Sequence, residues 1–133
     1  MHPAHRKRQW RGLIAAAAYT LLLTYLLLAP QPLNVFGEAG LRAEDALDRT
    51  IADDVQHMVA YGLLGYLLAR ASSGAQPVTQ HVCFWFCLAH AIGVEWLQVF
   101  VPARYFHWED TEANVIGLVA GWLVPLYASR TDS

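Results

Sequence analysis

The chain has 133 residues, a length typical of one domain, and a net charge of −2 at neutral pH. Hydrophobic residues make up 56% of it and charged residues 15%, whereas soluble domains carry about 25% charge. A nucleic-acid-binding protein would be basic, so this balance argues against one. The long apolar runs instead indicate a single membrane domain over residues 1–133, without repeats or linkers.

The first apolar run, GLIAAAAYTLLLTYLLLA at residues 12–29, is uncharged and follows a basic segment. Its 18 residues would span about 27 Å as a helix, close to the thickness of the bilayer hydrocarbon. A signal peptide is the alternative, but its apolar core is usually about 7–15 residues long. Ala29 is also followed by Pro30, which makes a poor cleavage site. We therefore predict a transmembrane helix.

Three further spans follow a polar connection at residues 30–52, within which LRAEDALDRTI is compatible with a short interfacial helix. We predict helices over residues 54–70, 81–101 and 110–128, with Pro102 ending the third. Cys83 and Cys87 share one face of the third helix and are interpreted as small packing residues. The predicted fold class is all-α, a membrane bundle of four transmembrane helices.

The distribution of basic residues predicts the orientation, because cytoplasmic loops are enriched in Lys and Arg. With the N-terminus and C-terminus cytoplasmic, the inner segments carry six basic residues and the outer segments three: Arg6, Lys7, Arg8, Arg11, Arg70 and Arg130 against Arg42, Arg49 and Arg104. This orientation places the unusual polar residues of the spans together, near the outer surface.

Glu95 is the most informative of these residues. It lies seven residues before Pro102, which places it about 10 Å below the helix end. A charged group within the hydrocarbon costs roughly 2.5–3.5 kcal/mol unless it faces the bundle and finds a partner. Gln98, three residues on, lies on the same helical face. We therefore expect Glu95 and Gln98 to point into the bundle.

The fourth span carries a stripe formed by Asp110, Asn114, Gly117 and Gly121, whose glycines have the GxxxG spacing that permits close helix packing. On the second span, His57 and Tyr61 share a face near Gly62 and Gly65. We expect three helices to gather a polar cluster, with Arg104 above it, from His57, Glu95, Gln98, Asp110 and Asn114.

Structural roles would also account for several of these residues. Asp53, Asp54 and Asp110 stand at helix starts, where aspartate caps free N–H groups. Gln98 and Asn114 are compatible with interhelical hydrogen bonding, and Glu95 with an ion pair that ties helices together. His90 lies off the Glu95 face and is interpreted as a packed, hydrogen-bonded histidine; His107 stays unassigned.

The ordered pattern in DDVQHMVAYGLLGYLL and GVEWLQVFVPARYFHWEDTEANVIGLVAG resembles the VanZ-like family over roughly residues 50–125. The matching positions are Asp53, His57, Tyr61, Glu95, Gln98, Pro102, Arg104, Asp110, Asn114, Gly117 and Gly121. The resemblance implies a small bacterial multi-pass protein of the cytoplasmic (inner) membrane, in a family associated with teicoplanin resistance. Many relatives have Lys where this chain has Asp54, so a role of that lysine does not carry over.

Our preferred hypothesis is a non-enzymatic protein that engages a cell-envelope lipid, such as an anionic or polyprenyl-phosphate lipid. The binding candidates are Arg104, Gln98, Asn114 and Tyr61. Arg104 offers a fork of donors suited to phosphate, and two outward-facing helix N-termini favour anions, although the nearby carboxylates oppose them. No cofactor is expected. A homo-oligomer is compatible with the sequence.

Two alternatives stay open. An intramembrane enzyme acting on a lipid-linked substrate would use His57 as general base, with Glu95 or Asp110 as its partner or as an acid. His57, Glu95, Asp110 and His107 are acceptable zinc ligands, but no HExxH-type spacing supports them, and we expect no metal. A small proton-coupled transporter would use Glu95 on a proton path and would be expected to dimerise.

Overall fold

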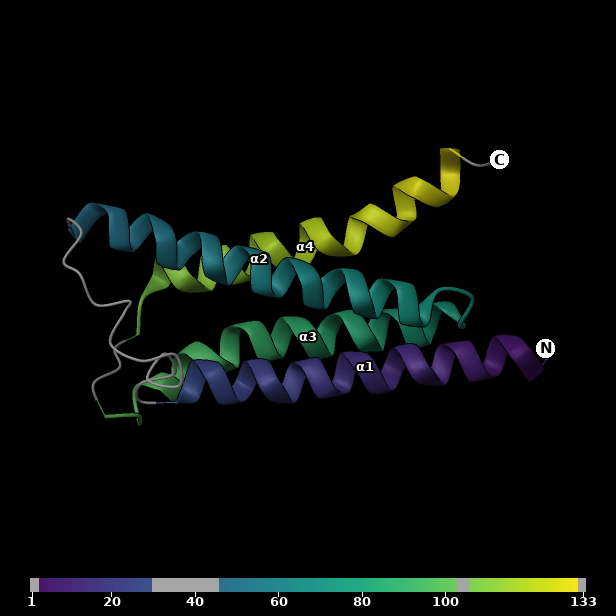
Figure 1. The fold of residues 1–133 in the computed structure, drawn as a ribbon, viewed down its shortest axis with the longest axis horizontal. Coiled ribbons are helices and arrows are strands. Elements are labelled where there is room, and N and C mark those ends of the chain that lie inside the picture. The colour runs from purple at the N-terminus through teal and green to yellow at the C-terminus, as the bar shows by residue number, and fades with distance from the viewer. Residues whose placement is uncertain (1–2, 30–45, 103–105, 132–133) are drawn as a thin grey trace, which may run out of the picture.

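The computed structural model describes residues 3–29, 46–102 and 106–131, and this part of the chain forms four helices and no strand. The helices are α1 (Pro3–Leu28), α2 (Ala46–Ser72), α3 (Pro77–Gln98) and α4 (Trp108–Thr131). The all-α prediction is confirmed. In Figure 1, the ends of the described chain and the α2–α3 turn lie at one end of the bundle, so consecutive helices alternate in direction.

The helices extend beyond the predicted spans. α1 begins at Pro3 rather than residue 12, α2 at Ala46 rather than 54, and α4 runs over Trp108–Thr131 rather than 110–128. The predicted bounds followed the apolar runs, which mark only the part of a helix that avoids water. The helical backbone hydrogen bonds continue beyond these runs into the polar sequence at either end. The segment at residues 46–51, predicted as part of an interfacial helix, is continuous with α2.

α3 is displaced toward the N-terminus relative to its predicted bounds of 81–101. It begins at Pro77, a residue that suits the first helical turn, and ends at Gln98. The next residues tighten into bonds three residues apart, from Phe100 N to Leu97 O (3.1 Å) and from Val101 N to Gln98 O (2.9 Å). α3 therefore ends at Gln98, and a turn separates its last helical residue from Pro102.

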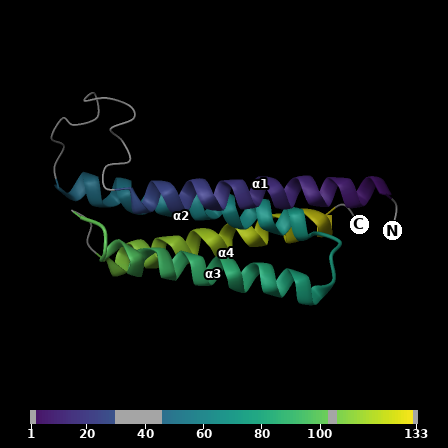
Figure 2. The ribbon, with the colours of Figure 1, turned by 90° about the horizontal axis from the view of Figure 1, so that it is seen from below.

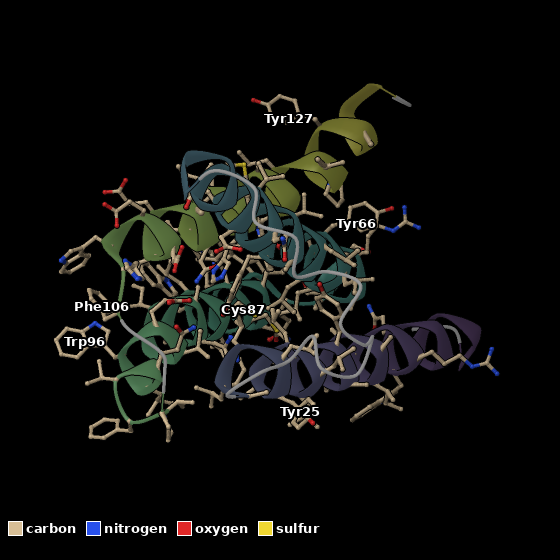
Figure 3. All side chains as sticks on the ribbon, turned by 60° about the vertical axis from the view of Figure 1, so that its left-hand side comes forward. Tyr25, Tyr66, Cys87, Trp96, Phe106 and Tyr127 are labelled. Atoms are coloured by element: carbon tan, nitrogen blue, oxygen red, sulfur yellow. The ribbon has the colours of Figure 1, made fainter. Side chains whose placement is uncertain are left out.

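The bundle has an apolar surface as well as an apolar interior. Tyr61, Leu64, Cys87 and Leu118 are fully buried, and Figure 3 shows Cys87 inside the bundle with Tyr25 and Tyr127 pointing away from it. Many large apolar side chains stay exposed, among them Leu21, Val82, Trp85, Phe86, Ile116 and Val124. Within the described chain, two segments are long and apolar enough to cross a membrane: Gln9–Leu28 and Pro77–Gln98. The composition of α2 and α4 does not meet that criterion.

α2 and α4 form the closest helix pair, flanked in Figure 2 by α1 and α3. A Cβ added at Gly117 would overlap the carbonyl of Met58, and one added at Gly121 would overlap the carbonyl of Gly62. On the α2 side, a Cβ at Gly65 would overlap the carbonyl of Leu118. The close approach expected from the GxxxG spacing is therefore confirmed, with its partner on α2.

Candidate functional site

Three helices bring His57, Glu95 and Asn114 into one hydrogen-bonded group, which we call the polar trio. His57 Nδ1 lies 3.0 Å from Asn114 Oδ1, and Asn114 Nδ2 donates to Glu95 Oε1 at 2.9 Å. His57 Nδ1 is also 3.5 Å from Glu95 Oε1. Glu95 and Asn114 are both fully buried, so the trio satisfies polar groups that would be costly in an apolar interior.

The glycine contact between α2 and α4 sets the position of this trio. Gly117, which packs against the backbone of Met58, is three residues after Asn114, and Met58 follows His57 directly. The two backbones therefore meet one turn from the point where the two side chains meet. α3 closes the group from its last two turns, because Asn114 Nδ2 also donates to the carbonyl of Ala91 at 3.3 Å.

The structure places the other predicted site residues around the trio with different surroundings. Gln98 is 2% exposed, and its side-chain nitrogen has no hydrogen-bond partner among the described residues. Asp110 is half-buried, close enough to His57 and His107 for their charges to interact. Arg104 lies outside the described residues. Asp110 is thus associated with the trio by charge, and no hydrogen bond to the trio is seen within the described structure.

Tyr61 belongs to a second polar group, one turn deeper. Its hydroxyl lies 3.1 Å from His90 Nδ1, and His90 Nε2 lies 2.8 Å from Thr24 Oγ1. His90 thus has the hydrogen bonds predicted for it, whereas Thr24 was not among the predicted residues. The available signal was Thr20 and Thr24, spaced by four within an otherwise apolar run; each hydroxyl also donates to the carbonyl four residues earlier. This second group links α1 to α2 and α3.

Carboxylates dominate the described charges at the trio's end of the bundle. Two of them, Asp53 and Asp54, lie on the α2 segment that precedes His57. The others lie in the first turns of α4: Glu109, Asp110 and Glu112. Aromatic rings gather at the same end, where Phe106 contacts both Trp96 and Trp108 with ring centroids 5.8 and 4.9 Å apart (Figure 3). An acidic, aromatic-rimmed end suits neutral or cationic groups better than an isolated anion.

Within the described residues, no three His, Cys, Asp or Glu side chains converge closely enough to hold a metal ion. The zinc set considered from the sequence, His57, Glu95, Asp110 and His107, is therefore not assembled as a ligand cluster. Two of these residues do approach each other: His57 Nδ1 and Glu95 Oε1 face each other directly, as an ion-pairing or hydrogen-bonding contact.

The sequence pattern that defines VanZ/LLP1 matches residues 16–128. The chain belongs to the VanZ/LLP1 family. No curated protein and no solved structure matches it significantly. The match takes in every member of the polar trio and both glycines of α4, so the trio lies within the family domain of this VanZ/LLP1 protein.

One position distinguishes this VanZ/LLP1 protein from the pattern noted in its sequence. The family resemblance implies Lys at position 54, whereas this chain has Asp54, and Asp54 Oδ1 is buried without a hydrogen-bond partner among the described residues. Asp54 also lies near enough to Asp110 for the two like charges to interact.

Proposed function

We propose that this VanZ/LLP1 protein is an integral membrane protein of the bacterial cytoplasmic membrane that crosses it four times, with both termini inside. The observation that supports the proposal best is the reversed distribution of polarity. Large apolar side chains cover the outside of the bundle, while Glu95, Gln98 and Asn114 are buried within it. A bilayer stabilises such a surface and requires polar groups to face one another inside. The basic residues in the first turns of α1, ahead of its apolar run, favour termini that face inward.

We further propose that the polar trio engages the headgroup of a cell-envelope lipid in the outer leaflet. In the proposed orientation, the trio lies near the outer surface, below Trp96 and Trp108, which suit the membrane interface. An anionic or polyprenyl-phosphate lipid would place its phosphate at Arg104, since the described carboxylates would repel it elsewhere. The buried donor of Gln98 would serve an oxygen of the same headgroup.

Lipid binding is testable by native mass spectrometry of purified protein supplied with polyprenyl phosphate or with phosphatidylglycerol. We expect at least one of the two lipids to stay bound, and Arg104→Ala to weaken its affinity about tenfold, the loss of one charged contact. Arg11→Ala, at the opposite end of the bundle, is the matched control and should bind as the wild type does. The absence of binding for both lipids, or equal binding by both variants, would contradict the proposal.

The trio also favours a second function, an intramembrane enzyme acting on a lipid-linked substrate. A histidine oriented by a second polar group is the arrangement expected of a general base, and His57 is oriented by Asn114 and Glu95. The same spectra distinguish the two functions, because turnover changes the mass of the supplied lipid and His57→Gln would abolish that change. The described interior beneath Tyr61 and His90 includes Leu64, Leu68 and Leu118, so nothing there favours a proton-coupled transporter.

A further inference from the structure

The orientation of the Asn114 amide follows from its backbone partner. The carbonyl of Ala91 can only accept a hydrogen bond, so the Asn114 atom that faces it at 3.3 Å is the donor Nδ2. The same nitrogen faces Glu95 Oε1 at 2.9 Å. If the amide were turned over, its oxygen would meet two oxygens. Asn114 Oδ1 therefore points at His57, whatever the protonation state of Glu95.

This orientation determines the proton on one nitrogen of His57. Asn114 Oδ1 has no proton to donate, and it lies 3.0 Å from His57 Nδ1. A hydrogen bond between them requires Nδ1 to carry the proton. Both the neutral and the charged ring meet that requirement, so a change in the charge of His57 takes place at Nε2.

We propose that Asn114 is a positioning residue that keeps a proton on His57 Nδ1 and thereby reserves Nε2 as the atom that meets a ligand or exchanges a proton. What reaches Nε2 rests on the proposed function, whereas the position of the ring proton does not. A neutral Nε2 accepts a hydrogen bond, so it pairs with a group that donates one, such as a headgroup hydroxyl. The titratable groups near His57 come from α2, α3 and α4: Glu95 lies 3.5 Å from Nδ1, and Asp110, whose charge interacts with His57, also interacts with Asp53, Asp54 and His107.

Nitrogen NMR of ¹⁵N-histidine-labelled protein in lipid nanodiscs tests the proposal, with His57→Gln used to assign the signals. We expect the neutral His57 to show a protonated Nδ1 and an unprotonated Nε2, and acidification to shift Nε2 by far the more. Tyr61→Phe is the matched control, because it alters a bond of His90 and should leave the His57 signals unchanged. A His57 with its neutral proton on Nε2 would overturn the proposal.

Variants at positions 95 and 114 separate the contribution of Asn114 from that of Glu95. Asn114→Leu should give a mixture of the two neutral tautomers, since it removes the acceptor. Glu95→Gln keeps Asn114, its contact with the Ala91 carbonyl and the acceptor that faces Nδ1, so this variant should keep the single tautomer. If Asn114→Leu kept a single Nδ1-protonated tautomer, Glu95 and not Asn114 would be the positioning group. If Asn114→Leu fails to fold, loss of the single tautomer in Glu95→Gln would likewise contradict the proposal. Any of these results is independent of whether a lipid binds.

Discussion

Replacing Gly121 by alanine is expected to lower the free energy of unfolding by about 2 kcal/mol, the usual range for overpacking a tight contact. The added methyl group would overlap the carbonyl of Gly62, which is backbone and cannot rotate away as a side chain could. α2 and α4 would have to separate, and the separation would also lengthen the contact between His57 and Asn114, about two turns away along α4. Equilibrium unfolding in mixed detergent micelles measures the change.

Gly93→Ala is the matched control for this substitution. Gly93 lies in α3 with nothing within 4 Å of an added Cβ, so the same chemical change meets open space. Alanine favours the helix over glycine, and the control should gain up to about 1 kcal/mol. Equal destabilisation by the two variants would show that α2 and α4 are not held together at Gly121.

Asn114→Leu is expected to cost about 3 kcal/mol, because it removes a donor from buried Glu95 and an acceptor from His57 while keeping a similar volume. Glu95→Gln should cost about 1 kcal/mol or less, since its side-chain oxygen can still accept from Asn114 Nδ2. Unfolding in mixed micelles distinguishes them. An unchanged free energy of unfolding in Asn114→Leu would show that the polar trio does not form. A large loss of stability in Glu95→Gln would show that the carboxylate charge itself stabilises the bundle.

The sequence was sufficient to predict four helices and a tight packing contact at the glycines of α4, whereas the structure identified α2 as the partner. Apolar runs and the GxxxG spacing depend on local composition, which a sequence displays directly. Helix ends were not predictable in the same way. Residues 46–51 were predicted as part of a separate short helix, yet they continue α2, because backbone hydrogen bonding does not stop where the apolar sequence does.

Helical spacing also grouped His57, Glu95 and Asn114 correctly, because each lies on a face that its own helix must bury. Spacing also placed Tyr61 on the same face as His57, but the Tyr61 hydroxyl meets His90 Nδ1, and His90 Nε2 in turn meets Thr24. Which residue pairs with Tyr61 depends on how α1 packs against α2 and α3, and the residue spacing within one helix does not determine that packing. Nor does spacing determine which atom of His57 bears the proton; that required the partner of each Asn114 atom.

Charge at the trio's end of the bundle bears on which lipid the protein would engage. The described carboxylates, including Asp54 and Asp110, whose charges interact, disfavour an anionic headgroup, so the proposed lipid contact assigns the phosphate to Arg104. A headgroup that combines a phosphate with hydroxyl groups would satisfy Arg104 and the polar trio together. Comparing the binding of polyprenyl phosphate with that of phosphatidylglycerol therefore tests which part of a headgroup is recognised, as well as whether a lipid binds.

The central claim is that the end of the bundle containing the polar trio faces the outside of the cell. Cysteine labelling tests it most directly, in a background with Cys83→Ala and Cys87→Ala. Glu109→Cys lies at the start of α4 near the trio, and Gln76→Cys lies in the α2–α3 turn at the opposite end; both positions are exposed. In intact cells, a membrane-impermeant maleimide should label Glu109→Cys and should label Gln76→Cys only after the membrane is opened. Labelling of Gln76→Cys in intact cells, with Glu109→Cys protected, would contradict the account.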